Sequence, residues 1–204
     1  MKVPIFVCTL AFPTVLCPLH VFEPRYRLMI RRAMESGSRQ FGMCAYLQND
    51  PHGFAEYGTM LEVRDVEFFS DGRSVVNTVG GRRFKVLHRT MIDGYYTATV
   101  DFLVDQTVEA NHVAATISLH DRVHTAAQNW ISEAPVALRQ RILQHFGTMP
   151  PVEADWISLP NGPAWHWWLL SILPLDPKAQ VLLYLHYLLL HSQKKGNAFC
   201  HYIT

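Results

Sequence analysis

The first hundred residues alternate short runs of β-branched and aromatic side chains with residues that favour turns. After residue 40 these runs occupy residues 41–47, 59–69, 74–79, 83–91 and 95–103. Asp71-Gly72, Gly80-Gly81 and Asp93-Gly94 separate them at the spacing of hairpin connections. The pattern predicts an antiparallel sheet that curls toward a barrel, with a turn at each of these three pairs.

The run 59–69 alternates between apolar and polar side chains with one irregularity. Met60 or Leu61, Val63, Val66 and Phe68 are the side chains expected to point inward. The spacing between Val63 and Val66 is one residue out of step, which predicts a β-bulge between them.

A single helix is predicted early in the chain, beginning at Pro24 and ending near the Ser36-Gly37-Ser38 turn. It contains four arginines, which could form a nucleic-acid patch, accompany a catalytic carboxylate or build a framework corner. Glu23 with Arg27 and Arg31 with Glu35 have the spacing of helical ion pairs, worth about 0.2 to 0.5 kcal/mol each. The formal net charge is only +1. We therefore favour the framework role and expect no binding of nucleic acid.

From residue 111 the apolar positions recur with the period of a helix. Helices are predicted from residue 113 to Trp130, from Pro135 to Gly147 and from Ala164 to residue 173, and a fourth begins near Asp176. Strands followed by helices predict an α+β fold. We expect a β-rich subdomain over residues 1–110, a helical bundle over 111–191 and a disordered tail over 192–204.

Two apolar segments resemble membrane or export signals but do not satisfy their requirements. Residues 181–190 are intensely apolar, yet ten residues are about half of what a spanning helix needs. Residues 3–19 are interrupted by Pro4, Pro13 and Pro18, so we expect extended chain there and no signal peptide. No membrane partner is predicted.

The four cysteines, at positions 8, 17, 44 and 200, form no C-x-x-C pair. No N-x-S/T glycosylation site occurs in the sequence. Buried free thiols in a cytoplasmic or nuclear protein fit both observations better than secretion does.

Several catalytic motifs are missing from the sequence. It contains no phosphate-binding G-x-x-x-x-G-K-[ST], no G-x-G-x-x-G and no G-x-S-x-G. His120 and His124 lie four apart, like two zinc ligands, but Asp121 replaces the usual glutamate and no third ligand follows. We expect an ordinary helix face, with no catalytic residue, no metal and no cofactor.

Three tryptophans, Trp165, Trp167 and Trp168, fall within four residues. They are too many for one helical face, so at least one is expected to point away from its helix's main contact. Core packing is the simpler interpretation. The alternative is an interface, because large aromatic side chains often anchor partners.

A collinear series of segments resembles the N-terminal domain of Lon proteases. It includes PLHVFEPRYRLMI, RQFGM, YGTMLEV, DGRSVVNTVGGRRFKVL and DGYYTATV. ILQHFGTMP and PNGPAWHWWLLSILPLDPKAQ are similar to the LON peptidase N-terminal domain and RING finger proteins in particular. The resemblance covers residues 3 to about 182.

This resemblance implies a PUA-like β pseudo-barrel followed by a helical bundle, in a domain that recognises client polypeptides. It implies a ubiquitin ligase in which a separate RING finger, absent here, supplies the activity. Within the resemblance, six residues are framework signatures without catalytic duty: Glu23, Arg25, Tyr26, Gly81, Arg83 and Phe84. The functional alternative is a ligand or metal pocket at the barrel or between the subdomains.

The resemblance ends at the C-terminus, where YLHYLLLHSQKKGNAFCHYIT replaces the charged segment of the family. The change suggests an alternative ending. A helix that is apolar on every side must be covered, so residues 181–190 either insert further into the core than in relatives or drive self-association. We favour self-association, because a core built around an amphipathic helix has no space for extra leucines.

Overall fold

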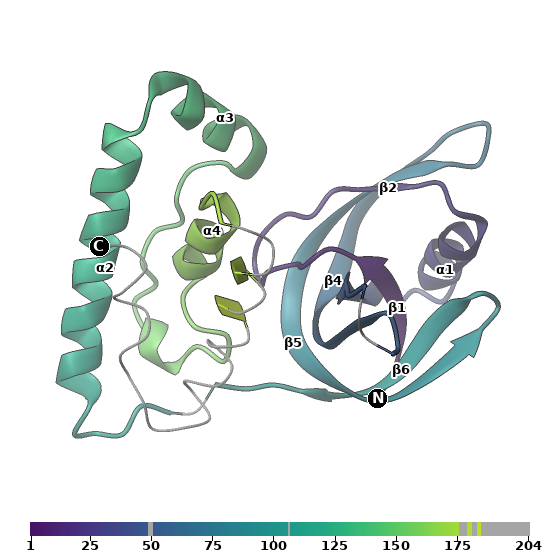
Figure 1. Ribbon diagram of the computed structural model, residues 1–204, viewed down its shortest axis with the longest axis horizontal. Coiled ribbons are helices and arrows are strands. Elements are labelled where there is room, and N and C mark those ends of the chain that lie inside the picture. The colour runs from purple at the N-terminus through teal and green to yellow at the C-terminus, as the bar shows by residue number, and fades with distance from the viewer. Residues whose placement is uncertain (49–50, 106, 176–178, 181–182, 185–204) are drawn as a thin grey trace. The chain divides into compact units, whose positions relative to one another are not determined.

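The computed structural model describes residues 1–48, 51–105, 107–175, 179–180 and 183–184. The chain divides into two compact units, with the boundary between Val104 and Asp105, just before the predicted boundary at residue 110. Each unit is described by itself (Figure 1). The predicted N-cap Asp176, most of residues 181–190 and the tail 192–204 lie outside the described residues.

Unit 1 consists of a six-stranded sheet and one helix. Its elements are β1 (Lys2–Cys8), β2 (Leu19–Val21), α1 (Pro24–Glu35), β3 (Gln40–Tyr46), β4 (Phe54–Phe68), β5 (Ser74–Ile92) and β6 (Tyr95–Phe102). The helix begins at Pro24, as predicted, because proline suits the first helical position. The N-terminal segment expected to be extended supplies β1 and β2.

The strands follow the order β2-β5-β4-β3-β1-β6, and β5 also pairs with β6, so the row of strands returns to β5. β1 and β3 run parallel, whereas the other pairings are antiparallel. The strands formed by the runs after residue 40 pair antiparallel, as predicted, and β1 of the N-terminal segment makes the sheet mixed. The connection from β1 to β3 contains α1, which gives it the length that a parallel crossover requires.

Two of the three predicted turns are present. Gly72 and Gly94 adopt positive φ angles of 82° and 84° at the β4–β5 and β5–β6 connections. The predicted turn at Gly80-Gly81 is wrong, because both residues lie inside the continuous strand β5. Gly80 instead allows a close approach of the chain: Thr14 N–H donates to its carbonyl oxygen, and an added Cβ would collide with the Phe12 carbonyl.

The core of unit 1 has two clusters, one under α1 and one inside the sheet. The first cluster joins Tyr26, Met29 and Ile30 of α1 to strand residues such as Leu61 and Val63. The predicted bulge is confirmed by a register shift between Val63 and Asp65. Phe68 does not point into the core as predicted, because its side chain is 60% exposed.

Unit 2 is helical in its described part. Its elements are α2 (Val113–Glu133), α3 (Val136–Phe146), the 3-10 turn η1 (Trp156–Ser158) and α4 (Ala164–Ile172). Its core gathers Trp165, Trp168 and Leu169 of α4 around Ala127 and Ile142. Together the two units confirm the predicted α+β class.

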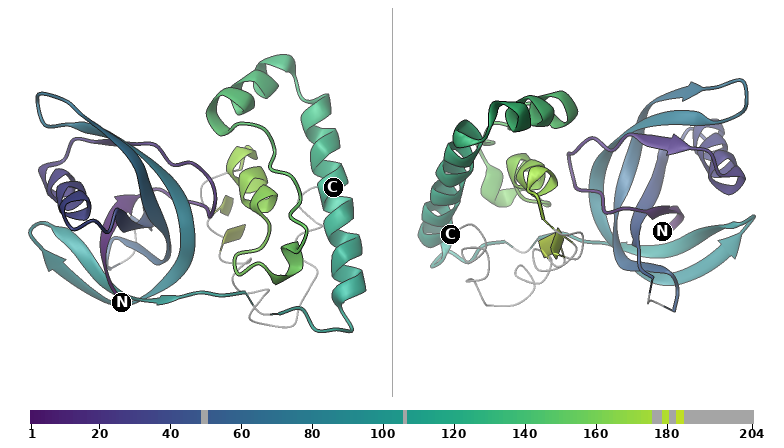
Figure 2. Two further views of the ribbon diagram at one scale, coloured as in Figure 1. Left: turned by 180° about the vertical axis from the view of Figure 1, so that it is seen from behind. Right: turned by 45° about the horizontal axis from the view of Figure 1, so that its top comes forward.

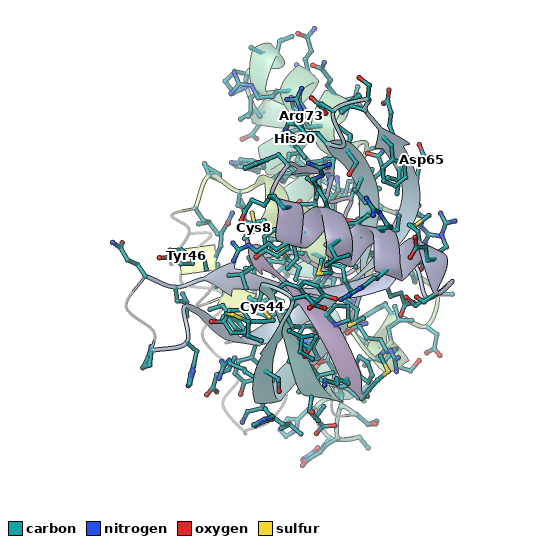
Figure 3. All side chains as sticks on the ribbon, turned by 90° about the vertical axis from the view of Figure 1, so that its right-hand side faces the viewer. Cys8, His20, Cys44, Tyr46, Asp65 and Arg73 are labelled. Atoms are coloured by element: carbon teal, nitrogen blue, oxygen red, sulfur yellow. The ribbon has the colours of Figure 1, made fainter. Side chains whose placement is uncertain are left out.

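None of the helices in the described part of the chain is long and apolar enough to cross a membrane. The prediction of buried thiols holds for Cys44 but not for Cys8, which is exposed beside α1 (Figure 3). Cys17 is half-buried, and burial raises the pKa of its thiol to about 11 and that of Cys44 to about 12. Both thiols are therefore protonated at neutral pH.

Candidate functional site

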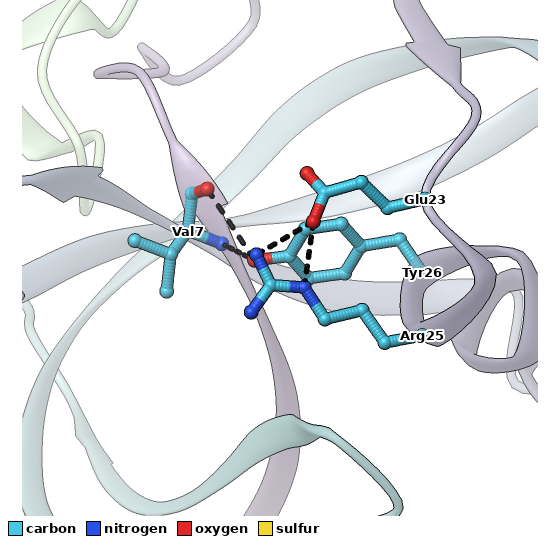
Figure 4. Close-up of polar contacts among 4 residues, drawn as sticks. All are labelled: Val7, Glu23, Arg25 and Tyr26. Carbon is cyan, nitrogen blue, oxygen red and sulfur yellow. Dashed lines mark hydrogen bonds and ion pairs between the residues drawn. The ribbon is translucent and has the colours of Figure 1, made fainter.

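The N-terminal end of α1 joins the first strand through Tyr26. Val7 N–H donates to the Tyr26 hydroxyl oxygen at 3.1 Å, and the Tyr26 hydroxyl donates to the Val7 carbonyl oxygen at 3.4 Å (Figure 4). The Tyr26 ring stacks on Phe6 with centroids 4.0 Å apart. Tyr26 therefore fixes α1 to β1, which is a structural role.

Glu23 and Arg25 form an ion pair with each other at the same corner. The Arg25 Nη2 lies 2.7 Å from the Glu23 Oε2, and the guanidinium also lies over the Tyr26 ring. The predicted ion pair of Glu23 with Arg27 is wrong, because Glu23 is the N-cap with extended backbone and lies outside the helix. Its carbonyl oxygen accepts from Arg27 N–H, but its carboxylate pairs with Arg25 instead.

Two of the other three arginines of α1, Arg27 and Arg32, reach the turns of two hairpins. Arg32 Nη1 donates to Asp93 at 2.7 Å and to the Tyr95 hydroxyl at 3.1 Å, at the β5–β6 turn. Arg27 lies against Gly72 at the β4–β5 turn, where an added Cβ would collide with its guanidinium. Figures 1 and 2 show α1 between these two hairpins. The arginine-rich helix thus braces both hairpins, as a framework corner would.

We expect Glu23→Ala to lower the free energy of unfolding by about 1 kcal/mol or less, since exposed ion pairs contribute little. Both side chains are about two-fifths exposed, at 40% for Glu23 and 42% for Arg25. Tyr26→Phe is the matched comparison and should cost more, because it leaves the Val7 N–H without its acceptor. Denaturant unfolding of the two variants measures which substitution lowers the free energy of unfolding more. A larger loss of stability for Glu23→Ala than for Tyr26→Phe would contradict the view that Glu23 forms only an exposed ion pair.

The second group of framework residues lies in the middle of β5. The Phe84 ring contacts the positions of Gly42 and Gly58 on the neighbouring strands, where a Cβ would lie 2.8 and 2.5 Å from its Cζ. Arg83 is fully buried, and its carbonyl oxygen accepts a bond from Leu103 N–H at 2.9 Å. Gly81, expected in a turn, lies in β5 beside a register shift of the β4–β5 ladder.

The three tryptophans of α4 are all buried. Trp165 Nε1 donates to His120 Nε2 at 3.1 Å, Trp167 Nε1 to the Asn161 carbonyl and Trp168 Nε1 to the Phe146 carbonyl. Each indole therefore joins α4 to another segment of unit 2. This arrangement favours the packing interpretation over exposed anchors for a partner.

His120 is enclosed between aromatic rings and polar partners. Its ring stacks on Trp156 at 3.9 Å, and its Nδ1 lies 3.1 Å from Asp121 Oδ1. A neutral His120 that accepts from Trp165 at Nε2 carries its proton on Nδ1 and donates it to Asp121. Both ring nitrogens are thus engaged by protein groups. Among the described residues no three His, Cys, Asp or Glu side chains are placed to hold a metal.

Unit 2 should lose stability when His124 titrates. Burial lowers the pKa of His124, and the neighbouring His120 lowers it further, while Asp121 acts in the opposite direction. The unfolded chain then binds a proton more readily than the folded chain below about pH 6.5, the usual histidine value. The free energy of unfolding is expected to stay level above that pH and to fall below it.

The matched variant is His124→Gln, which keeps a polar side chain without a titrating group. Unfolding of both proteins between pH 8 and pH 5 isolates the contribution of His124 from that of the other histidines. The wild-type protein should lose more stability than the variant below about pH 6.5. If the free energy of unfolding of both proteins changed in parallel with pH, His124 would titrate alike in the folded and the unfolded chain.

Exposed apolar side chains gather on the β5–β6 hairpin, which the sequence patterns did not single out. Leu87, Met91 and Ile92 of β5 are 61%, 56% and 39% exposed. The available signal was the composition of LHRTMI, where apolar residues flank polar ones without a strict alternation. A register shift between Val86 and His88 disturbs the alternation.

Comparison with known proteins places this arrangement in a family. Residues 2–184 match the model of the ATP-dependent protease La (LON) substrate-binding domain. The chain belongs to the LON substrate-binding domain family. The family is that of a substrate-binding domain and not of a catalytic one, which agrees with the resemblance seen in the sequence.

Two relatives of this LON domain agree with the assignment. A LON peptidase N-terminal domain and RING finger protein of Schizosaccharomyces pombe is 32% identical over 99 residues, which are 41% of this chain and 20% of that protein. The match thus spans about a fifth of that relative's length. The crystal structure of a Lon N-terminal domain protein from Xanthomonas campestris has a TM-score of 0.56 at 24% identity, and covers 90% of this chain and 89% of its own. The latter likeness shows the fold.

Proposed function

We propose that this LON domain recognises client polypeptides for a RING-type ubiquitin ligase. The observation that carries the proposal is the match of residues 2–184 to a substrate-binding domain. The RING finger in the name of the Schizosaccharomyces pombe relative supports the connection with ubiquitin transfer. In this proposal the domain selects the client and a RING finger on another part of the protein directs ubiquitin to it.

The described geometry is consistent with a rigid recognition platform. The helix α1 braces two hairpins through Arg27 and Arg32, so the strands between them are held in place before a client arrives. Exposed apolar side chains on one of these hairpins offer the contact that an unfolded polypeptide favours. Clients of this kind, produced by failed folding in the cytoplasm or nucleus, would connect the domain to protein quality control.

The test is binding of an unfolded polypeptide to the full chain. Reduced and carboxymethylated lactalbumin carries a fluorescent label, and its anisotropy is followed as the chain of 204 residues is added. We expect saturable binding with a Kd in the micromolar range, about −8 kcal/mol. The same lactalbumin with its disulfides intact should bind far more weakly.

Equal binding of the folded and unfolded forms, or binding of neither, would overturn client recognition. The ligase part has its own test, in which the chain is fused to an active RING finger and incubated with ubiquitin and its conjugating enzymes. Ubiquitin transfer to unfolded lactalbumin should then exceed transfer by the RING finger alone. Equal transfer would remove the connection to ubiquitin while leaving client binding intact.

A further inference from the structure

Among the residues that the structure describes, no strand pairs with one side of β5 in its last third. Its ladder with β4 ends where Tyr57 faces Lys85, whereas its ladder with β6 continues to Ile92. In the part of the chain that the structure describes, no backbone–backbone hydrogen bond reaches residues 87–92 from the β4 side. This segment is therefore a strand edge, with N–H and C=O groups available for another strand.

The pairing of β6 identifies which backbone groups face that edge. Val100 N–H donates to the Met1 carbonyl at 2.9 Å, so Val100 directs its backbone groups toward β1 and away from β5. Strand alternation then turns Thr97 and Thr99 toward β5, where they face Thr90 and His88. The intervening residues Arg89 and Met91 consequently direct their N–H and C=O groups to the open side.

The side chains along the edge favour a particular partner. Leu87, Met91 and Ile92 expose apolar surface, as described above. The charged side chains between residues 85 and 92 are Lys85 and Arg89, with no carboxylate among them. Arg89 is positioned by Phe54, since its guanidinium lies 4.7 Å from the ring centroid and Nη2 donates to the Phe54 carbonyl at 3.4 Å. An apolar strand with an acidic residue complements this surface.

We propose that an extended, apolar segment of polypeptide bearing a carboxylate adds as a strand to β5 at Leu87–Ile92. The inference rests on the proposed function and specifies how the client is held. The backbone of the segment exchanges hydrogen bonds with Arg89 and Met91, its apolar side chains cover Leu87 and Met91, and its carboxylate pairs with Arg89. Backbone bonds make the recognition tolerant of sequence, which suits a receptor for many clients.

The other hairpin has a comparable edge that is less suited to this role. Within the described part of the chain, residues 64–68 of β4 pair only with β5. Arg39 Nε and Nη2 donate to the Val63 and Arg64 carbonyls and occupy the beginning of this edge. Asp65 and Glu67 add carboxylates within the strand. Occupied carbonyls and charges within the strand are the ordinary means by which an edge is protected from pairing.

This second edge supplies a matched control. Cys17 N–H donates to the Thr78 carbonyl, so Thr78, Val76 and Ser74 direct their backbone groups toward β2. Val75 and Asn77 therefore face β4, and Phe68, which stands opposite Ser74, directs its N–H to the open side. Proline at Phe68 removes an outward N–H from an edge strand, as proline at Met91 does.

The experiment measures binding of a fluorescein-labelled heptapeptide in which valine alternates with threonine around one central glutamate. The full chain and its Met91→Pro and Phe68→Pro variants are titrated, with thermal unfolding as a check of their folding. We expect Met91→Pro to weaken binding about tenfold, because it removes one backbone donor and one apolar contact. Phe68→Pro should leave binding unchanged. A peptide with lysine in place of the glutamate should bind the unaltered chain more weakly.

The inference would be overturned if the two proline variants weakened peptide binding equally, or if neither weakened it. The proposed function would still stand in that case, provided that the chain binds unfolded lactalbumin. If the unaltered chain did not bind unfolded lactalbumin, both the proposed function and the inference would be refuted. If Met91→Pro does not fold, amide hydrogen exchange of the unaltered chain decides. The Arg89 and Met91 amides should exchange more slowly with the heptapeptide present, whereas the Phe68 amide should not, and an unchanged rate at Arg89 and Met91 would refute strand addition.

Discussion

Phe84→Ala is expected to lower the free energy of unfolding by about 3 to 5 kcal/mol, the range typical of removing a buried aromatic side chain. The Phe84 ring is fully buried in the cluster inside the sheet and lies over two strands at positions where neither has a side chain. Without it, Gly42 and Gly58 would border an empty space that backbone alone cannot fill. Denaturant unfolding measures the loss, and Phe84→Leu should recover part of it.

Gly58→Ala tests the same contact from the other side. Its Cβ would lie 2.5 Å from Phe84 Cζ and 2.8 Å from Cys44 Sγ, and would also collide with the Met43 carbonyl. We expect a cost of about 1 to 3 kcal/mol from this overpacking. In the double variant with Phe84→Leu the cost should be less than the sum of the two, because leucine lacks the ring atom Cζ that collides with the new Cβ. Strict additivity would mean that the two residues do not share this contact.

The local rules read from the sequence succeeded where the determining residues are close together. Pro24 started α1, Gly72 and Gly94 made the turns, and Gly147 followed the last residue of α3. Each depends on the φ angle or hydrogen bonds of a few neighbouring residues. The alternation of strand residues was also sufficient to find the bulge after Val63.

The errors arose where a distant segment decides the outcome. Gly80-Gly81 has the composition of a turn. Gly80 instead lacks a side chain because Phe12 and Pro13 pass close to it, and the local pattern does not contain that contact. The parallel pairing of β1 with β3 depends in the same way on the path of the chain through α1. The spacing of Glu23 and Arg27 predicts a helical ion pair, but the local pattern does not contain the extended N-cap conformation of Glu23, whose carboxylate pairs with Arg25.

The proposed client-binding edge was the least predictable part. Periodicity reports which face of a strand is buried, but it says nothing of where a ladder ends. Leu87 and Met91 look like ordinary strand residues until the β4 ladder is seen to stop at Lys85. The three tryptophans are a different case, since core packing was the simpler interpretation of their spacing and the fold encloses all three.

Trp165→Ala is expected to cost about 3 to 5 kcal/mol, as for other large aromatic side chains removed from a core. The Trp165 indole is fully buried and contacts His120, His124 and His166 with ring centroids 5.2, 5.0 and 4.1 Å away. Its loss should loosen unit 2 more than unit 1. Amide hydrogen exchange would show this as faster exchange in α2 and α4, with the strands of β3 and β4 little changed.

Trp165→Phe separates the hydrogen bond from the packing. A phenyl ring keeps most of the apolar contact but leaves His120 Nε2, which accepts from the indole at 3.1 Å, without its donor. A buried acceptor left unsatisfied costs about 1 to 3 kcal/mol, so this variant should be clearly destabilised although less than Trp165→Ala. The double variant with His120→Phe removes the orphaned acceptor and should regain part of that loss, since a phenyl ring can still stack on Trp156. If the double variant were no more stable than Trp165→Phe, the bond between the indole and His120 would contribute nothing to the stability of unit 2, and shape alone would explain why the two rings meet.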